Sequence, residues 1–338
     1  MQTTNKKIAG YDTDKKYYWS PVIHWEKKDR ELIINTFSYA GAGADVFPEF
    51  YYLTQKGVTP AELMEHFSEI NSTEFSEFIQ DLVKKRVLVS SILTPMEIFG
   101  TQNKMFKNEY SEEIIYNPDE LKKFKMKQLN RMPVANSGKK VDMKQDVEYP
   151  AIIRDRRTYR VFDSTKKISL DVFSQLMSVL KQTRDEDKVT YYYASAGGLY
   201  PIDVYVYLKD NRIENMQAGL YYYSPLDNSL ILVSNSCVIT DEAHFFVNKD
   251  IYNSSAFSIF FIYNAEATMP KYGGMAYFYA CIDTGLMVGA LTCAAELNNI
   301  GLCSIGDMNF KKIEKYFKLN ENQVLIHTVE GGYKIIYE

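Results

Sequence analysis

Two periods of hydrophobic spacing alternate along the chain and predict a mixture of strands and helices. The run ELIINTFS, which begins at Glu31, is typical of a strand. The segment Thr59-Pro60-Ala61-Glu62 predicts a helix start, because Thr is a good cap, Pro fits the first turn and Glu follows three residues after the cap. We expect that helix to run to Ile70. A second helix, starting at Asn71 or Ser72, is indicated by apolar residues at helical spacing: Phe75, Phe78, Ile79, Leu82 and Val83.

The strand-like run VLVSSIL follows this second helix. A strand, two short amphipathic helices and a closing strand predict a small winged-helix-like α/β unit over residues 1–95. Residues 96–147 are polar and rich in Lys, Glu, Asn and Met, which favours a linker that is partly helical.

The pattern from residue 148 to residue 338 predicts one larger domain. A helix with an N-cap at Ser169 is expected to reach Lys181, and alternating or continuous apolar runs predict strands. The strand segments are Asp203–Asp210, a hairpin that turns at residues 226–228, and the run SIFFIYNAE. Adjacent strands joined by a hairpin favour an antiparallel or mixed sheet.

The longest predicted helix covers residues 276–299, with Gly301 as its C-terminal stop. Small and apolar residues share overlapping rows of this helix: Ile282, Leu286, Gly289, Ala290, Cys293, Ala294 and Leu297. Small side chains permit close helix approach, and a subunit interface would use it. An ordinary core helix explains the pattern equally well.

Composition and charge narrow the function classes. The chain has 338 residues, 46% hydrophobic and 24% charged, with a net charge of -4 and no basic stripe, so nucleic acid is not an expected partner. No uncharged apolar run approaches the ~18 residues of a membrane span, and the N-terminus lacks an apolar signal region. We therefore expect no membrane association and a cytoplasmic location. The four Cys and four His show no metal-ligand spacing, so neither a metal site nor a disulfide framework is expected.

Four short segments contain residues that can bind a ligand or carry chemistry. Arginines at 154, 156, 157 and 160, with Thr158 among them, form a cluster of guanidinium groups that can grip a phosphate, although spacing alone favours a solvated basic face. The segment Ser195-Ala196-Gly197-Gly198 lets backbone amides approach a ligand, or simply forms a turn.

The other two segments flank the longest helix. Lys271 and Tyr272 are adjacent proton carriers if their surroundings tune them, and ordinary loop residues otherwise. The segment GLCSIGD, residues 301–307, presents backbone amides or merely connects a helix to a strand.

The order and spacing of these four segments resemble the nitroreductase superfamily, and SAGGLYP and KYG are similar to its SagB-type branch of azoline oxidases. The resemblance covers residues 150–332; it departs at Ala194, where the family often has Pro. It implies an α+β fold whose central, mostly antiparallel sheet is flanked by helices, in an intertwined homodimer that holds FMN at the subunit interface.

Carried over to this chain, the resemblance assigns roles to individual residues. Arg156, Arg157, Thr158 and Arg160 would bind the FMN phosphate and ribityl chain, with Lys334 as a further candidate phosphate contact. The loop Ser195, Ala196, Gly197 and Gly198 would lie against the flavin from the other subunit, and the backbone at Ile305 and Gly306 would approach N5 and O4. Lys271 and Tyr272 would be the catalytic pair.

The implied activity is oxidation of a peptide thiazoline or oxazoline to the aromatic azole in natural-product biosynthesis, ribosomal or nonribosomal, with oxygen as electron acceptor. Lys271 or Tyr272 would take a ring proton while a hydride leaves to the flavin. The N-terminal unit would recognise a leader peptide or carrier protein, or would only stabilise the dimer. An NAD(P)H-dependent nitro or quinone reductase and a non-catalytic interaction scaffold are the alternatives.

Overall fold

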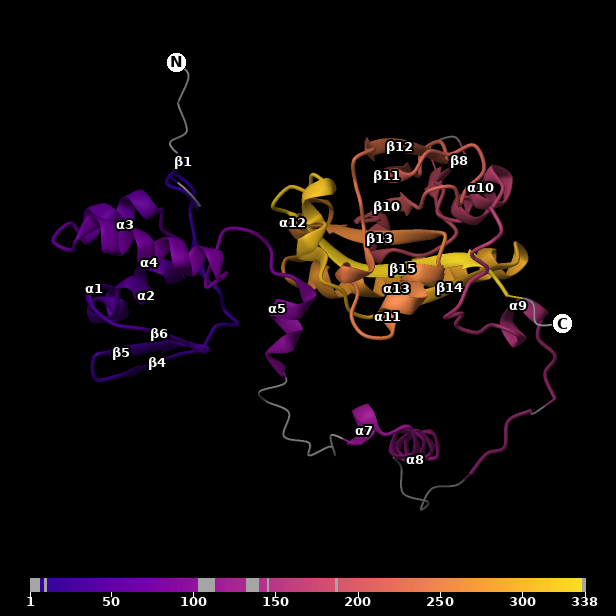
Figure 1. Ribbon diagram of the computed structural model, residues 1–338, viewed down its shortest axis with the longest axis horizontal. Coiled ribbons are helices and arrows are strands. Elements are labelled where there is room, and N and C mark those ends of the chain that lie inside the picture. Colours follow the sequence, from indigo (N-terminus) through magenta and orange to yellow (C-terminus); the bar gives the residue numbers. More distant parts are fainter. Residues whose placement is uncertain are drawn as a thin grey trace.

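A six-stranded antiparallel sheet forms the centre of the larger domain in the computed structural model, which describes residues 7–8, 11–102, 113–131, 140–144, 146–185 and 188–335 (Figure 1). The strand order is β12-β11-β10-β13-β15-β14. The strands are β10 (Ile202–Leu208), β11 (Gly219–Ser224), β12 (Ser229–Ser234), β13 (Phe257–Asn264), β14 (Ile300–Ile305) and β15 (Gln323–Tyr333). Every neighbouring pair is antiparallel, which confirms the predicted sheet.

Alternate residues of each strand enter different cores on the two faces of this sheet. Val204 and Val206 of β10 pack with α10 (Leu170–Ser178) and α13 (Met275–Leu297). Tyr205, between them, packs on the opposite face with residues from α11 (Asn248–Ser254) and from the short turns after β14. The sheet is therefore covered on both faces, as expected for helices flanking a central sheet.

The hairpin and the first helix of this domain form where the sequence predicts them. Strands β11 and β12 pair across residues 225–228, and Asn228 adopts a left-handed φ of 55° in the turn. Ser169 caps α10 by accepting from the backbone N–H of Val172, and Phe173, Leu176 and Met177 are buried. The helix ends at Ser178, slightly before the predicted Lys181.

Helix α13 is the longest described helix, but its buried side differs from the predicted one. Among the residues it buries are Ala280, Asp283 and Met287, whereas Ile282 and Leu286 are 47% and 44% exposed. The helix ends at Leu297, and Asn299 provides the left-handed residue with φ of 55°. The predicted stop at Gly301 is therefore wrong, because that glycine already belongs to β14.

The N-terminal unit has a hydrophobic core of its own, built only from residues between Tyr11 and Leu88 with their partly buried neighbours. Its strands are β3 (Tyr18–Trp19), β4 (Trp25–Lys28), β5 (Glu31–Ile34), β6 (Phe37–Tyr39) and β7 (Leu88–Val89), and its helices are α1 (Ala42–Asp45), α2 (Phe47–Gln55), α3 (Pro60–His66) and α4 (Ser72–Lys84). The predicted strand over VLVSSIL is confirmed only at Leu88 and Val89.

The two predicted helices of this unit are confirmed with one change of length. Thr59 and Glu62 form the predicted capping box of α3, which ends at His66 rather than Ile70. Asn71 caps α4, whose buried residues lie at the predicted spacing. Helices α1 and α2 escape the sequence pattern because they are short, with four and nine residues.

Residues 95–131 contain short helices: α5 (Pro95–Gly100), α7 (Glu113–Tyr116) and α8 (Pro118–Leu129). Helix α5 packs on the larger domain, since Ile92 and Ile98 join a buried cluster with Tyr263 and Ala276.

The remaining described elements are short. The strands are β1 (Lys7–Ile8), β2 (Tyr11–Asp12), β8 (Thr183–Asp185) and β9 (Lys188–Thr190), and the helices are α9 (Ala151–Arg154) and α12 (Met269–Tyr272). The 3₁₀ turns are η1 (Ala196–Gly198), η2 (Asp241–Ala243), η3 (Ala265–Ala267), η4 (Phe310–Lys312) and η5 (Glu314–Tyr316).

Helix α13 is also the one helix in the described ranges that is long and apolar enough, by composition, to cross a membrane, with a mean hydropathy of 1.5. This is weak evidence, because the core helix of a globular domain passes the same test. Here α13 packs on α10 and on the sheet through Met287, Leu291 and Ala295.

Candidate functional site

The loop that contains Ser195 is fixed to α13 by one buried carboxylate. Ser195 Oγ donates to Asp283 Oδ2 at 2.5 Å, and the backbone N–H of Ala196 donates to Asp283 Oδ1 at 3.2 Å. Ser195 Oγ in turn accepts from the backbone N–H of Tyr200 at 2.9 Å. Asp283 is 3% exposed, so its charge is balanced by these charge-assisted hydrogen bonds. The loop is thereby held in one conformation.

Gly197, at the tip of this loop, lies against the predicted catalytic pair. It adopts a φ of 65°, and an added Cβ would stand 2.8 Å from Lys271 Nζ and closer still to Tyr272 Oη. Lys271 Nζ also lies over the Tyr272 ring, 4.9 Å from its centre. The fold thus brings the second and third predicted segments together, although they are more than seventy residues apart in sequence.

The rings of three tyrosines pack together next to the same loop. Tyr200 has an unusual φ of 47°, which is strained for a bulky residue. Its ring stacks on Tyr191 at 3.8 Å between centres and meets Tyr193 edge-on at 5.7 Å. Burial raises the pKa of Tyr193 well above its usual range, so its hydroxyl stays protonated. These contacts offset the strain and keep the loop ordered.

The first and fourth predicted segments also meet, at the edge strand of the sheet. The backbone N–H of Tyr159 donates to Leu302 O at 3.1 Å, so the arginine segment runs beside β14. Gly301 permits this approach, because an added Cβ there would stand 2.7 Å from Tyr159 Cβ.

Several cations gather where the arginine segment crosses β14. Arg157 and Lys334 both lie over the Tyr159 ring, 5.1 and 4.9 Å from its centre. Lys334 is ion-paired with Glu296 of α13 at 2.5 Å. Arg156 and Arg160 are exposed and have no ion-pair partner among the described residues, and Thr158 is exposed beside them. This group can therefore still bind an anion, whereas Arg154 already pairs with Asp155.

The two pairs of segments occupy two separate places along α13. Asp283 holds the Ser195 loop, and Glu296 contacts the arginine group through Lys334. From Asp283 to Glu296 the helix rises by roughly 20 Å. Within one chain the four segments thus form two half-sites.

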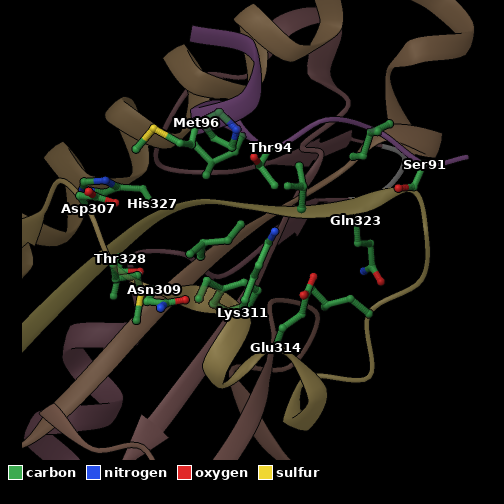
Figure 2. Close-up of a pocket in the computed structure, with 18 of the residues that line it drawn as sticks. Ser91, Thr94, Met96, Asp307, Asn309, Lys311, Glu314, Gln323, His327 and Thr328 are labelled. Atoms are coloured by element: carbon green, nitrogen blue, oxygen red, sulfur yellow. The ribbon is translucent and has the colours of Figure 1, made fainter. Parts of the chain in front are cut away.

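A cleft of about 890 Å³ begins at Ile305 and Gly306 (Figure 2). Residues of α5 and the segment before it form one wall, and the ends of β14 and β15 with the turns after β14 form the other. In Figure 2, Thr94 and Met96 lie on one side, and Lys311 and Glu314 lie on the other. Ile305 is buried as the last residue of β14, while Gly306 is exposed.

His327 lies in the same cleft, on β15. Its pKa is lowered because burial disfavours the charged imidazolium, so the ring is neutral at pH 7. A neutral imidazole can both donate and accept a hydrogen bond.

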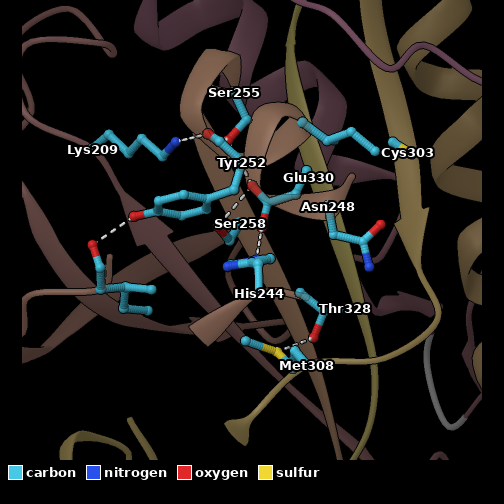
Figure 3. A network of polar contacts seen from close by, with 12 residues as sticks. Lys209, His244, Asn248, Tyr252, Ser255, Ser258, Cys303, Met308, Thr328 and Glu330 are labelled. Carbon is cyan, nitrogen blue, oxygen red and sulfur yellow. Dashed lines mark hydrogen bonds and ion pairs between the residues drawn. The ribbon is translucent and has the colours of Figure 1, made fainter. Parts of the chain in front are cut away.

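A buried polar network lies behind the floor of the cleft (Figure 3). Glu330 is fully buried and accepts from Ser255 Oγ at 2.6 Å, from Ser258 Oγ at 2.9 Å and from His244 Nε2 at 3.2 Å. Beside it, Lys209 Nζ donates to a backbone carbonyl and lies over an aromatic ring. His244 Nδ1 is buried and has no hydrogen-bond partner among the described residues. The other contacts of the network join β13, β15 and the segment after β12.

Some residues of the site were not anticipated from the sequence. Asp283 and Glu296 contact the two half-sites. The sequence pattern does not single them out, because each is an isolated acid within an apolar helix. The sequence does contain a signal for such residues, because a carboxylate on a buried helix face requires a hydrogen-bond or ion-pair partner. The cleft wall at α5 also escaped, because that segment was assigned to a linker.

The fold is of the α+β class, with a central antiparallel sheet flanked by helices, and comparison with known proteins gives the family. The nitroreductase family matches residues 153–333, more than half of the chain, and the chain belongs to that family. A protein of Methanocaldococcus jannaschii that carries the name nitroreductase is 23% identical over 135 residues, which is 40% of this chain and 67% of that protein.

One solved structure shows a similar fold. A chain of the microcin synthetase McbBCD complex of E. coli, with truncated pro-MccB17 bound, matches 81% of this chain and 98% of its own length at 17% identity, with a TM-score of 0.51. Because 81% exceeds the family match, the likeness of fold extends to residues before Ile153. A nitroreductase structure from Ralstonia eutropha matches 58% of this chain and 89% of its own, with 18% identity and a TM-score of 0.45.

Proposed function

We propose that this protein is an FMN-dependent oxidoreductase that oxidises a thiazoline or oxazoline ring in a peptide to the thiazole or oxazole, during biosynthesis of a peptide natural product. The observation that carries the proposal is the contact between Gly197 and the side chains of Lys271 and Tyr272. It places two proton carriers against the loop expected to face the flavin, as an azoline oxidase requires.

The residues present fit FMN. Arg156 and Arg160 have no ion-pair partner in the part of the chain that the structure describes, and guanidinium groups can bind a phosphate through two hydrogen bonds each. The hydroxyl of Thr158 lies beside them and could hydrogen-bond to the ribityl chain. Gly306 is exposed and lacks a side chain, so its backbone N–H could approach a ring atom closely. FMN, when bound, supplies the hydride acceptor.

A homodimer would complete the site. One chain carries the arginine half-site and the Ser195 half-site apart from each other, whereas a second copy could bring one of each together. The exposed side of α13 suits that contact, since Phe278, Ile282 and Leu286 are exposed and Gly285 and Gly289 have open space beside them. Large apolar side chains exposed in a row mark protein contacts.

The proposed division of labour on the protein side follows from the contacts. Tyr272 or Lys271 removes the ring proton. The other member of the pair hydrogen-bonds to the residue that acts as base, or influences it through its charge. Asp283 keeps the Ser195 loop in place, so that the pair and the ring meet in one geometry. The ring loses one proton and one hydride, which balances its conversion to the aromatic azole.

The peptide substrate would reach the site attached to a leader peptide or a carrier protein that the N-terminal unit recognises. Support comes from the McbBCD complex, which has pro-MccB17 bound and whose matched chain shares the fold of this protein beyond the nitroreductase segment.

Anaerobic mixing of the FMN-loaded protein with a thiazoline peptide tests the proposal. The flavin absorbance should bleach with formation of one thiazole per flavin, and Tyr272→Phe should slow bleaching by ~10²-fold or more. NADPH mixed alone with the same protein is the comparison. Rapid bleaching by NADPH with none by the thiazoline would instead support a nitro or quinone reductase.

A further inference from the structure

The cleft that begins at Ile305 and Gly306 is much larger than one heterocycle. Its volume of about 890 Å³ lies near the upper end of the ~300–1,000 Å³ that pockets for drug-sized ligands occupy. A five-membered azoline ring fills only a small part of that space. A flavin ring against Gly306 would take a further part, and the remaining space can receive the groups attached to the azoline.

The wall made by α5 is anchored firmly enough to act as a binding surface. Ile92 and Ile98 pack into a buried cluster of the larger domain, and the ring of Phe99 meets that of Tyr277 edge-on at 6.5 Å. Thr94 and Glu97 form a capping box at the start of the helix. Glu97 is also ion-paired with Arg86, whose Nη2 donates to Ile92 O at 3.2 Å.

The exposed side of that wall is apolar. Met96 and Phe99 line the cleft and are 63% and 42% exposed, although side chains of this kind usually pack away from water. Amide groups of Asn309 and Gln323 line the opposite side and can hydrogen-bond a main chain (Figure 2).

The charges of the cleft are balanced. Among the described residues, three cations line it, namely Lys15, Arg86 and Lys311, and so do three anions, namely Asp307, Glu314 and Glu321. Two of the cations are already paired, Lys15 with Glu321 and Arg86 with Glu97. A dinucleotide with its phosphates would require an excess of positive charge, which this cleft does not offer. An uncharged polypeptide segment requires none.

We infer that the cleft between α5 and the ends of β14 and β15 binds the uncharged peptide segment that flanks the azoline, with Met96 and Phe99 as its apolar contacts, and that it does not bind a nicotinamide dinucleotide. The inference rests on the proposed function and assigns a substrate-binding role to residues 90–100, between the N-terminal unit and the catalytic domain.

Calorimetric binding of a synthetic, uncharged hexapeptide with one central thiazole to the FMN-loaded protein tests the inference. The variant Met96→Ala/Phe99→Ala should weaken binding at least tenfold, because it removes both apolar contacts. Tyr52→Ala is the matched control: Tyr52 is also a large exposed side chain, 59% exposed, but lies outside the cleft, and its variant should bind as the natural protein does. NADPH at millimolar concentration should not displace the peptide.

Three results would overturn the inference: no binding to the natural protein, equal affinity in the double variant, or displacement by NADPH. Melting temperatures of both variants should match the natural protein, and the single variant Met96→Ala serves if the double one unfolds. Binding does not depend on turnover, so the two proposals can fail separately. If the thiazoline bleaches the flavin in the natural protein and in the double variant alike, the function stands and the cleft assignment fails. If the peptide binds as expected and the thiazoline never bleaches the flavin, the cleft assignment stands and the proposed function fails.

Discussion

Gly197 and Tyr272 lie in direct contact, with the α-carbon of the glycine against the phenol hydroxyl. There is no room for a Cβ between them. The glycine at this position therefore determines where the tyrosine and its neighbour Lys271 can stand.

Substitution of Gly197 by Ala should lower azoline oxidation by about 10²-fold, the cost of displacing a catalytic group by about 1 Å. Gly198→Ala is a close control, because Gly198 also has a left-handed φ, 68°, but has open space around its α-carbon. Both variants should lose roughly 1–2 kcal/mol of stability from backbone strain. Turnover measured beside thermal melting separates the two effects, and equal activity in both variants would contradict the assigned contact.

Asp283→Asn should loosen the Ser195 loop. Asn retains one acceptor oxygen and loses the charge, so we expect a loss of about 1.5–3 kcal/mol, as for hydrogen bonds to charged groups. Because Ser195 donates to this carboxylate, Ser195→Ala and Asp283→Asn should be strongly non-additive in a double-mutant cycle of unfolding free energies. Additive losses would mean that the hydrogen bond does not form in solution.

Arg156→Ala and Arg160→Ala should each weaken FMN binding by about 10- to 100-fold, because each removes a charge-assisted contact to the phosphate. Riboflavin lacks the phosphate, so its affinity should change little. Arg154→Ala is the control in the same cluster, since Arg154 pairs with Asp155 at 2.8 Å. Fluorescence titration with both flavins measures the difference, and parallel losses for FMN and riboflavin would place the phosphate elsewhere.

Lys209 should make a contribution to stability that rises between pH 8 and pH 10. Burial lowers its pKa to about 8 from 10.5, so the folded protein releases this proton before the unfolded chain does. For this group the unfolded state then binds more protons, so its contribution to the free energy of unfolding increases by about 2 kcal/mol from pH 7 to pH 9.5. The thiols of Cys237, Cys281 and Cys303 act in the opposite direction, because burial raises their pKa values.

Lys209→Met isolates this contribution. The variant also loses the contact with the Tyr252 ring, so its absolute stability differs. The difference in unfolding free energy between the natural protein and the variant should shift by about 2 kcal/mol in favour of the natural protein from pH 7 to pH 9.5. Urea unfolding of both proteins at pH 7 and pH 9.5 gives the comparison. An identical pH dependence in the two proteins would show that Lys209 is not desolvated.

Features governed by neighbouring residues could be predicted from the sequence. The capping box of Thr59 and Glu62 needs only four residues, and the turn at Asn228 needs only the flanking strands. The stop of α13 shows where local rules fail. Both Asn299 and Gly301 can end a helix, and pairing of β14 with β15 decided between them.

The site depends on contacts that are distant in sequence. The loop before β10 meets Asp283 of α13 through Ser195 and meets Lys271 after β13 through Gly197, which no local pattern contains. Resemblance to a family, and not periodicity, therefore indicates the functional roles of the four segments. Their grouping into two half-sites could be seen only in three dimensions.

A single unbroken helix, α13, links the two half-sites, so their separation and angular offset are set by a count of residues. Each added residue between Asp283 and Glu296 would turn one half-site about 100° around the helix axis and shift it about 1.5 Å. Residues along this segment can be substituted without changing this geometry, whereas an insertion or deletion would change the angle between the two half-sites around the helix axis. The length of that stretch of helix therefore fixes how far apart one chain presents its two half-sites.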